Sequence, residues 1–237
     1  MYDVETHHGA RPRDRAAVRA WRVRRRADPQ HRNSGSALFR AASLTPDSKP
    51  HIAVGNKYDK LLKSERSVDI LKVRDKIKAD SKSVSPMSMM VLAIRLYDVG
   101  LRDEAVFWYY AAEDHCLEPT KVIDLQASGL DKADQAMRGF TAALSPIIKG
   151  YAFCDLAKQQ VQRQKALEWT ENNPYGTVLA ERFTARPGDR AANLQLAIAD
   201  VKRNAAEERA YFANARKRRA FYAKRKRHQD DVKYCWK

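Results

Sequence analysis

The chain has 237 residues, enough for one large domain or two small ones, and its 44% hydrophobic content excludes a fully disordered protein. Glycine and proline number only nine each, which argues against a turn-rich all-β protein and favours helices. No run of about eighteen apolar residues occurs, so we expect no transmembrane helix.

Positive charge is concentrated at the two ends of the chain. The formal net charge is +16, of which residues 1–50 carry +6 and residues 201–237 carry +9, so residues 51–200 are nearly neutral. A basic end can bind nucleic acid, an acidic protein or an anionic membrane surface, or it can simply stay solvated.

Residues 1–56 are Arg-rich and offer few large apolar side chains to dock against a core, so we expect a disordered arm. The arm lacks the apolar stretch of a secretory signal, which favours a cytoplasmic protein. Such a sequence also arises when a start codon is assigned too far upstream, so the mature protein could begin nearer Lys57. In that case the protein could be periplasmic or exported, and the compartment stays open.

Residues 57–237 are predicted to form a single helical domain with a basic C-terminal helix. Order begins near Tyr58, and Val68, Leu71 and Ile77 share one face of a first helix that ends before Ser81. Ser85-Pro86 is typical of a helix start, with Ser as the N-cap and Pro in the first helical position.

That helix should run from Pro86 to Val99 and end at Gly100, and a second should run from Arg102 to His115. Residues 122–125 are interpreted as extended. The remaining elements are three helices: one capped by Asp131 and reaching Ala143, one starting at Ser145-Pro146 and reaching Glu171, and one capped by Asp189.

The last of these helices carries apolar residues at steps of three, four or seven, which places them on one face. Beyond Asn214 it becomes basic. The residues of this face are Leu194, Ile198, Val201, Ala205 and Phe212.

The segment Met89 to Ala112 resembles a tetratricopeptide repeat, and the likeness covers one repeat, residues 86–119. Gly100 stands at the turn, while Met89 and Leu96 depart from the pattern because they occupy positions that favour aromatic residues. The matching positions are Met89, Leu92, Ala93 and Leu96 in the first helix and Ala105, Tyr109 and Ala112 in the second. The resemblance implies a protein-binding groove.

A single repeat cannot bury its own apolar face, so neighbouring helices must cover it. We therefore predict an all-α protein, either an irregular helical bundle or a short solenoid of tetratricopeptide-like helix pairs.

Phe107 and Trp108 belong to a run of four aromatic residues that cannot all face one core. They either pack on a neighbouring helix or form an exposed patch that binds a partner.

Cys154 and Cys235 are candidates for a disulfide if the protein is exported, and for free or buried thiols if it is cytosolic. Cys116 lies beside His115, but adjacent residues on a helix point apart and no third ligand stands nearby. We therefore predict no metal or nucleophile site there.

Residues 215–227 combine cations with two aromatic residues. The cations could neutralise phosphates while an aromatic ring stacks on a base, or they could suit the negative end of the helix dipole. The candidate partner-binding residues in this stretch are Arg216, Arg218, Arg219, Phe221, Tyr222, Lys224 and Arg225.

No carboxylate pair has a spacing that predicts acid–base catalysis, and no cofactor or metal motif is present. The leading hypothesis is a non-enzymatic interaction protein, of adaptor or immunity type and bacterial origin, that binds an acidic protein partner. The alternatives are a nucleic-acid-associated protein that uses its basic C-terminal helix and an enzyme on an unfamiliar helical scaffold.

Overall fold

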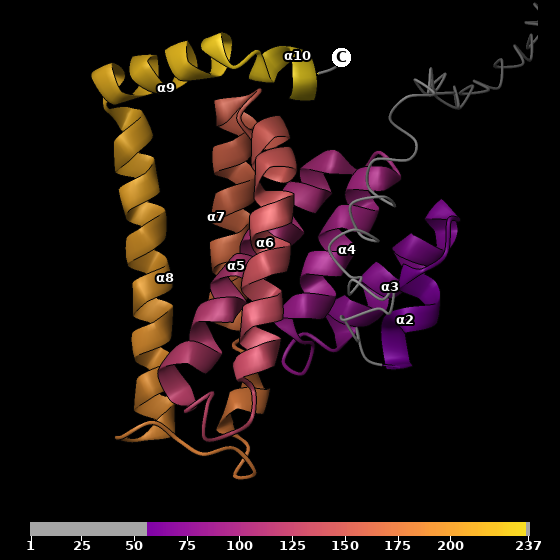
Figure 1. Ribbon diagram of the computed structural model, residues 1–237, viewed down its shortest axis with the longest axis vertical. Coiled ribbons are helices and arrows are strands. Elements are labelled where there is room, and N and C mark those ends of the chain that lie inside the picture. The colour runs from indigo at the N-terminus through magenta and orange to yellow at the C-terminus, as the bar shows by residue number, and fades with distance from the viewer. Residues whose placement is uncertain (1–55, 236–237) are drawn as a thin grey trace, which may run out of the picture.

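The computed structural model describes residues 56–235, in which nine α-helices and one 3-10 helix pack together (Figure 1). The predicted all-α bundle is confirmed for this part of the chain, and no helix in it is long and apolar enough to cross a membrane. The predictions for residues 1–55 lie outside the described residues. The elements are α2 (Asn56–Leu62), α3 (Ser67–Ala79), α4 (Pro86–Asp98), α5 (Arg102–Val122), α6 (Asp131–Ala152), α7 (Leu156–Asn172), η1 (Gly176–Leu179), α8 (Arg190–Ala213), α9 (Ala215–Arg227) and α10 (Asp230–Tyr234).

Helix α4 is predominantly apolar, and every residue from Ser88 to Tyr97 is buried. Its start is as predicted: the Ser85 hydroxyl accepts a hydrogen bond from the Ser88 amide at 3.1 Å, with Pro86 in the first turn. Its end is a glycine turn, in which Gly100 has φ +85° and the Leu101 amide donates to the Leu96 carbonyl at 2.9 Å.

The helix pair expected on either side of Gly100 is present, as α4 and α5. The residues that were predicted to join the two helices are fully buried, and the alanines among them leave room for close packing. These residues are Leu92, Ala93, Leu96, Ala105, Tyr109 and Ala112.

The predicted face of α3 is correct at Ile77 and wrong at its other two residues. The helix buries Ile70, Val73 and Ile77, whereas Val68 is 41% exposed and Leu71 is half-buried. The buried three recur at consecutive steps of three and four, which keeps them on one side of the helix, whereas the predicted set leaves a gap of six residues before Ile77.

Two predicted boundaries in the middle of the chain are also wrong. Helix α5 continues past Pro119, because its last residue, Val122, is buried against the segments that contain Val178 and Leu194. A proline within a helix lacks one backbone hydrogen bond, and here that loss is offset by tertiary packing.

Helix α6 runs straight through Ser145-Pro146 instead of starting there, because Leu144 and Ile148 on either side of the proline are both fully buried. The helix breaks later, and Asp155 caps α7 by accepting a hydrogen bond from the Lys158 amide at 3.1 Å. Asp131, the predicted cap of α6, is instead its first helical residue and caps nothing.

Helix α8 follows the prediction. Asp189 caps it, accepting from the Ala192 amide at 2.8 Å, and all five residues of its predicted apolar face are buried. The segment expected to be extended contributes Ile123, which forms an isolated antiparallel bridge with Ala185. The chain does not continue straight into the basic stretch. Asn214 ends α8 and caps α9, which crosses the end of the bundle formed by α6 and α7 (Figure 1).

Candidate interaction surface

Helix α9 has two distinct faces. The residues that turn inward follow the steps of three and four that define one side of a helix, and they are Arg218, Phe221, Tyr222 and Arg225. Every other residue from 215 to 227 is exposed. One side of the helix therefore packs against the bundle, and the rest of its circumference faces solvent.

Aromatic packing holds the inward face. The Phe221 ring lies 4.9 Å from the ring of Phe153 and 5.0 Å from that of Phe212, measured between centroids. The Tyr222 hydroxyl donates to the Phe153 carbonyl at 3.4 Å, and Arg218 donates to the Phe212 carbonyl at 2.8 Å. The aromatic cluster thus joins α9 to the end of α8 and to the α6–α7 connection.

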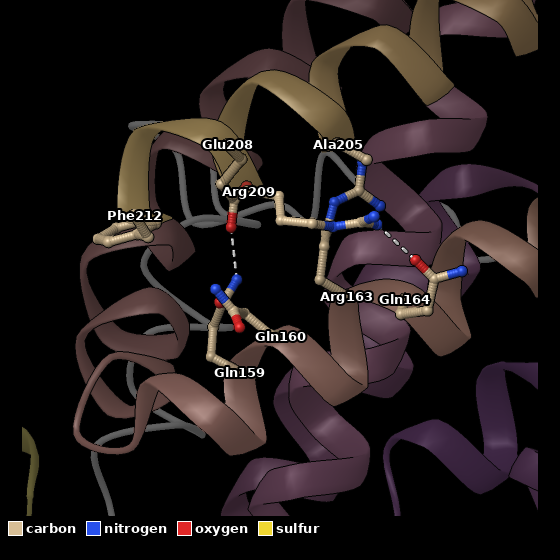
Figure 2. Close-up of a pocket in the computed structure, with 8 residues that line it drawn as sticks. All are labelled: Gln159, Gln160, Arg163, Gln164, Ala205, Glu208, Arg209 and Phe212. Carbon is tan, nitrogen blue, oxygen red and sulfur yellow. Dashed lines mark hydrogen bonds between the residues drawn. The ribbon is translucent and has the colours of Figure 1, made fainter. Parts of the chain in front are cut away.

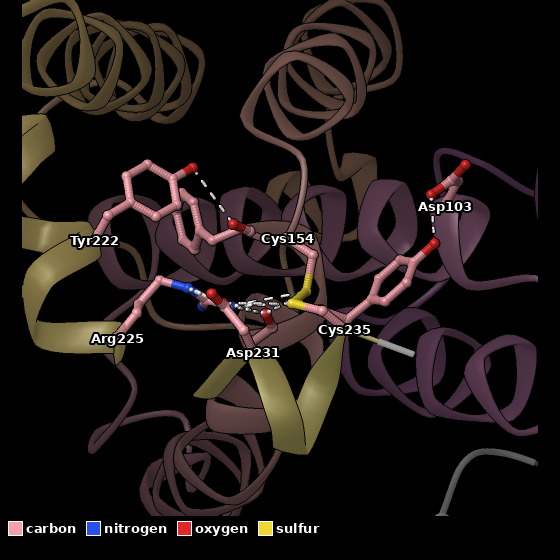
Figure 3. Close-up of a disulfide and its surroundings, with 9 residues drawn as sticks. Asp103, Cys154, Tyr222, Arg225, Asp231 and Cys235 are labelled. Atoms are coloured by element: carbon pink, nitrogen blue, oxygen red, sulfur yellow. Dashed lines mark hydrogen bonds and ion pairs between the residues drawn. A yellow bond between two sulfur atoms is a disulfide. The ribbon is translucent and has the colours of Figure 1, made fainter. Parts of the chain in front are cut away.

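A disulfide between Cys154 and Cys235 closes the other end of this attachment (Figure 3). The two Cα atoms are 5.5 Å apart across 81 residues of sequence. The bond ties the residue after α10 to the connection between α6 and α7, so α9 and α10 are held at both ends.

Arg225 occupies the space beneath the disulfide and is only 4% exposed. Its guanidinium donates to the Gly150 carbonyl at 3.1 Å and to the Asp231 carboxylate at 2.8 Å, and it lies 3.4 Å from the Cys235 sulfur. Figure 3 shows Arg225 and Asp231 meeting beside the sulfur atoms. A buried arginine needs such compensation, because an unpaired buried charge is strongly destabilising.

Gly150 permits the close approach of α10 to α6. A Cβ atom at this position would lie 2.6 Å from the ring of Tyr234, which is closer than real contacts allow. The glycine therefore serves packing between α6 and the C-terminal segment.

The outward face of α9 is a dense cationic surface, which we call the α9 cationic face. It contains no acidic residue, and none of its cations forms an ion pair with any residue that the structure describes. By contrast, α8 pairs Lys202 with Glu171 and Arg203 with Asp200. The face consists of Arg216, Lys217, Arg219, Lys224, Lys226 and Arg227, with Ala220 and Ala223 between them.

The structure divides the predicted partner-binding residues into two groups. Arg216, Arg219 and Lys224 lie on the α9 cationic face, whereas the other four predicted residues of this helix face inward. Phe221 and Tyr222, the rings that the sequence offered for stacking on a base, pack within the aromatic cluster.

Sequence reasoning missed Lys217, Lys226 and Arg227, and a signal for them was present. Two adjacent aromatic residues in a basic helix mark its inward side, and the positions three before and four after Phe221 complete that side. The remaining cations must then face outward.

The aromatic patch predicted on α5 does not exist as a surface. Trp108 is fully buried, with its ring 5.3 Å from that of Trp169, and Phe107 is half-buried against the same core. Core packing, the alternative left open by the sequence, describes both residues. Trp108 is accordingly removed from the set of partner-binding candidates.

A cavity beside the disulfide has a volume of about 410 Å³. Its polar lining already serves the local structure: Asp103 accepts a hydrogen bond from the Tyr151 hydroxyl at 2.9 Å, and Asp155 caps α7. Lys158, Gln162 and Cys235 also line it.

A smaller cavity between α7 and α8 has a volume of about 20 Å³, room for roughly one water molecule (Figure 2). Gln159 reaches Glu208 across it, and Arg209 donates to Gln164 at 2.6 Å. These hydrogen bonds tie α7 to α8.

Buried charge is concentrated between α5 and α7. Arg163 binds Asp114 through two hydrogen bonds, of 2.6 and 2.9 Å, and its guanidinium lies 5.1 Å from the centre of the Tyr110 ring. Burial raises the pKa of Asp114 to about 6, although Arg163 opposes this shift. The pair joins the two helices from inside the core.

His115 and Glu118 are fully buried one turn apart on α5. Burial raises the pKa of Glu118 to about 8, although the Tyr175 amide donates to its carboxylate at 2.6 Å, and burial lowers the pKa of His115 to about 3. Neither residue lines either of the two cavities above, so their perturbed pKa values indicate burial in the core and not an open catalytic site.

Cys116 is the free cysteine among the described residues, and burial raises the pKa of its thiol far above the usual range. A thiol that resists ionisation is a poor nucleophile. The structure also brings together no group of three metal-ligating side chains among the described residues.

Comparison with known proteins gives one relative. An uncharacterized protein of Haemophilus influenzae is 31% identical over 153 residues, which make up 65% of this chain and 59% of that protein. The chain thus spans less than two-thirds of the length of the relative that it matches. No family model matches the chain, and no solved structure matches it.

Proposed function

We propose that this protein is a non-enzymatic helical interaction protein, of adaptor or immunity type, that binds an acidic protein through the α9 cationic face. One observation carries the proposal: six exposed cations without intramolecular ion pairs lie together on a helix that is anchored on its other side. Uncompensated charge on a rigid element attracts an oppositely charged partner and accelerates its association.

The anchoring supports binding as well as stability. The aromatic cluster, the ion pair of Arg225 with Asp231 and the disulfide all hold α9 before any partner arrives. A preorganised surface loses less conformational entropy on binding, so more of the interaction energy contributes to affinity.

The proposal places the binding surface on α9 and not on the tetratricopeptide-like pair. A groove in such a pair would be lined by its first helix, but α4 is buried along its length from Ser88 to Tyr97. The resemblance of α4 and α5 to one tetratricopeptide repeat remains a proposal, and both helices contribute many residues to the core.

An acidic protein suits the α9 cationic face better than nucleic acid does. Single-stranded nucleic acid is commonly bound by aromatic rings that stack on bases, and Phe221 and Tyr222 are occupied in packing. Nucleic-acid binding would then rest on phosphate contacts alone. The enzyme hypothesis receives less support, because the carboxylates of the larger cavity are engaged in structural hydrogen bonds.

The origin of the chain is part of the proposal. Similarity to a Haemophilus influenzae protein over 65% of the chain supports a bacterial source. An adaptor- or immunity-type role is consistent with a small helical body whose main distinguishing surface is charged.

The test is affinity capture from the source organism with nuclease present, using the full chain and two variants of equal charge. One variant changes the six cations of the α9 cationic face to glutamine. The matched control changes six exposed lysines that lie in α2 and α3 or directly after α2, which are Lys57, Lys60, Lys63, Lys72, Lys76 and Lys78.

The expected result is a specific acidic protein that the parent chain and the control retain and the α9 variant loses. Because the interaction is electrostatic, retention should fall steeply with added salt. Retention that nuclease abolishes, or an acidic protein that both variants hold equally, would contradict the proposal.

A further inference from the structure

We propose that the α9 cationic face is a docking seam for an acidic α-helix of the partner, packed lengthwise along α9. This inference rests on the proposed function and adds the secondary structure and charge pattern of the partner segment. It follows from the spacing of the exposed residues, which repeats every seven positions.

The centre of the face follows the spacing of a coiled-coil seam. Arg216, Ala220, Ala223 and Arg227 stand at successive steps of four, three and four, which are the steps between the core positions of a heptad. All four are exposed, and they lie directly opposite the inward side of the helix. A second helix running beside α9 would meet this line first.

The two alanines make close approach sterically feasible. Interaxial distances between packed helices are about 8–10 Å, and small residues at the contact favour the lower end of that range. Ala220 and Ala223 occupy the middle of the line, while the two arginines at its ends can extend along a partner. A partner helix would therefore approach α9 most closely beside the two alanines and would lie farther from it beside the two arginines.

The flanks of the seam are uniformly basic. Lys217 and Lys224 lie on one side and Arg219 and Lys226 on the other, and the members of each pair are seven residues, or about 10 Å, apart along the axis. These are the heptad positions at which interhelical salt bridges determine the choice of partner. Four cations there call for carboxylates at the matching positions of the partner.

The same pattern argues against the other occupants of a helical surface. A second copy of α9 would place like charges against each other, which is repulsive. A membrane is disfavoured because the exposed face offers no apolar side chain larger than alanine to insert among lipids. An acidic helix satisfies both the shape and the charge of the seam.

The experiment uses two synthetic acidic probes of identical net charge. One is a helical peptide of about three heptads with glutamate at the flanking positions and alanine or leucine at the core positions. The other contains the same residues in scrambled order with two helix-breaking prolines. The protein is the full disulfide-bonded chain, alongside the variants Ala220→Phe and Ala223→Phe.

A phenylalanine at either position blocks close approach without changing the charge of the face. We expect each variant to bind the helical peptide about tenfold more weakly than the parent chain, and to bind the scrambled peptide equally well. Ala206→Phe, at an exposed alanine of α8, is the steric control and should change neither affinity. Thermal unfolding of each variant establishes that it is folded.

Three results would overturn the seam while leaving the proposed function intact. They are unchanged binding of the helical peptide to both phenylalanine variants, equal affinity of the parent chain for the two probes, and binding of anionic vesicles that is tighter than binding of the helical peptide. If the chain binds neither acidic probe, the proposed function itself fails, and the seam fails with it.

Discussion

Helices α4 and α9 are both thirteen residues long, yet they represent opposite ways of placing a helix in a bundle. Helix α4 is predominantly apolar and is buried from Ser88 to Tyr97. Helix α9 has eight Lys and Arg residues and only one buried residue, Arg225. Helix α4 is held by packing around most of its circumference. Helix α9 is held by a few contacts on one side, and the rest of it is exposed to solvent.

The difference extends to the way charge is treated. Inside the bundle, Arg163 is bound by both oxygens of Asp114, and on α4 Arg95 pairs with Asp98 at 2.8 Å. On the α9 cationic face the exposed cations form no ion pair with any described residue, although Lys217 lies over the Tyr211 ring. Buried charge must be compensated within the fold, whereas exposed charge can be kept for a partner at little loss of stability.

The largest effect is expected in α4. Leu92→Ala removes a fully buried side chain between α4 and α5 and should lower the free energy of unfolding by about 2–5 kcal/mol. Urea denaturation monitored by circular dichroism measures this loss. The matched change on α8, Leu196→Ala, concerns a leucine that is 61% exposed and should have a much smaller effect. Similar losses in the two variants would contradict the burial of Leu92 in the core.

The anchor of the C-terminal helices comes next. Cys235→Ser removes the disulfide and should lower the free energy of unfolding by about 2–4 kcal/mol, because the reduced chain gains conformational freedom when unfolded. Hydrogen exchange should show the protection of α9 and α10 falling before that of α4.

Cys116→Ser is the control for the disulfide, because this cysteine is unpaired. Thiol titration of the denatured, unreduced protein should find one free thiol in the parent chain. A count of three would rule out the disulfide, and with it the expected stability difference.

The buried Glu118 provides a pH-dependent effect of about 1 kcal/mol per pH unit. Its pKa is raised to about 8, so the folded protein keeps a proton that the unfolded chain releases near pH 4.5. The stabilisation is fully present below pH 4.5 and is lost as pH rises through 8. Glu118→Gln removes this dependence, and the interval from pH 6.5 to 8 isolates it.

That interval separates Glu118 from the other buried groups. The lowered pKa of His115, about 3, makes stability fall as pH drops below 6.5, and the raised pKa values of Asp98 and Asp114, about 6, act mainly below pH 6. Urea midpoints measured at pH 6.5 and pH 8 test the prediction, with the exposed Glu65→Gln as control. A parent chain whose midpoint does not fall over this interval would contradict it.

The smallest effect on stability belongs to the α9 cationic face. Changing any one of its six cations to glutamine should alter the free energy of unfolding by less than about 0.5 kcal/mol. Removing several of them also removes repulsion between neighbouring like charges, which favours the folded helix. Thermal unfolding at low salt measures this change. A large loss of stability would mean that the cations hold the bundle together and are not available to a partner.

Local signals in the sequence predicted several of the helix ends. Ser85-Pro86, Gly100 and Asp189 act through the backbone within one turn, so their effect does not depend on the rest of the protein. The same signals failed where packing opposed them. Leu144 and Ile148 keep α6 helical through Pro146, because a break there would remove one of them from the core.

The candidate site was predicted in part for the same reason. The composition of residues 215–227 predicted a basic surface, and Arg216, Arg219 and Lys224 were among the residues predicted to form it. It did not indicate that Arg225 would be buried, because that depends on the Gly150 carbonyl and on Asp231, which meet it only in the folded protein.

By itself, the sequence determined the helical class, the charge of the C-terminal end and the capped starts of α4 and α8, since each depends on residues adjacent in the chain. Only the tertiary structure decided that α4 is buried from Ser88 to Tyr97, that Trp108 belongs to the core and that Cys154 meets Cys235. Those outcomes depend on contacts between distant segments, whose burial is favourable only when the whole bundle has formed.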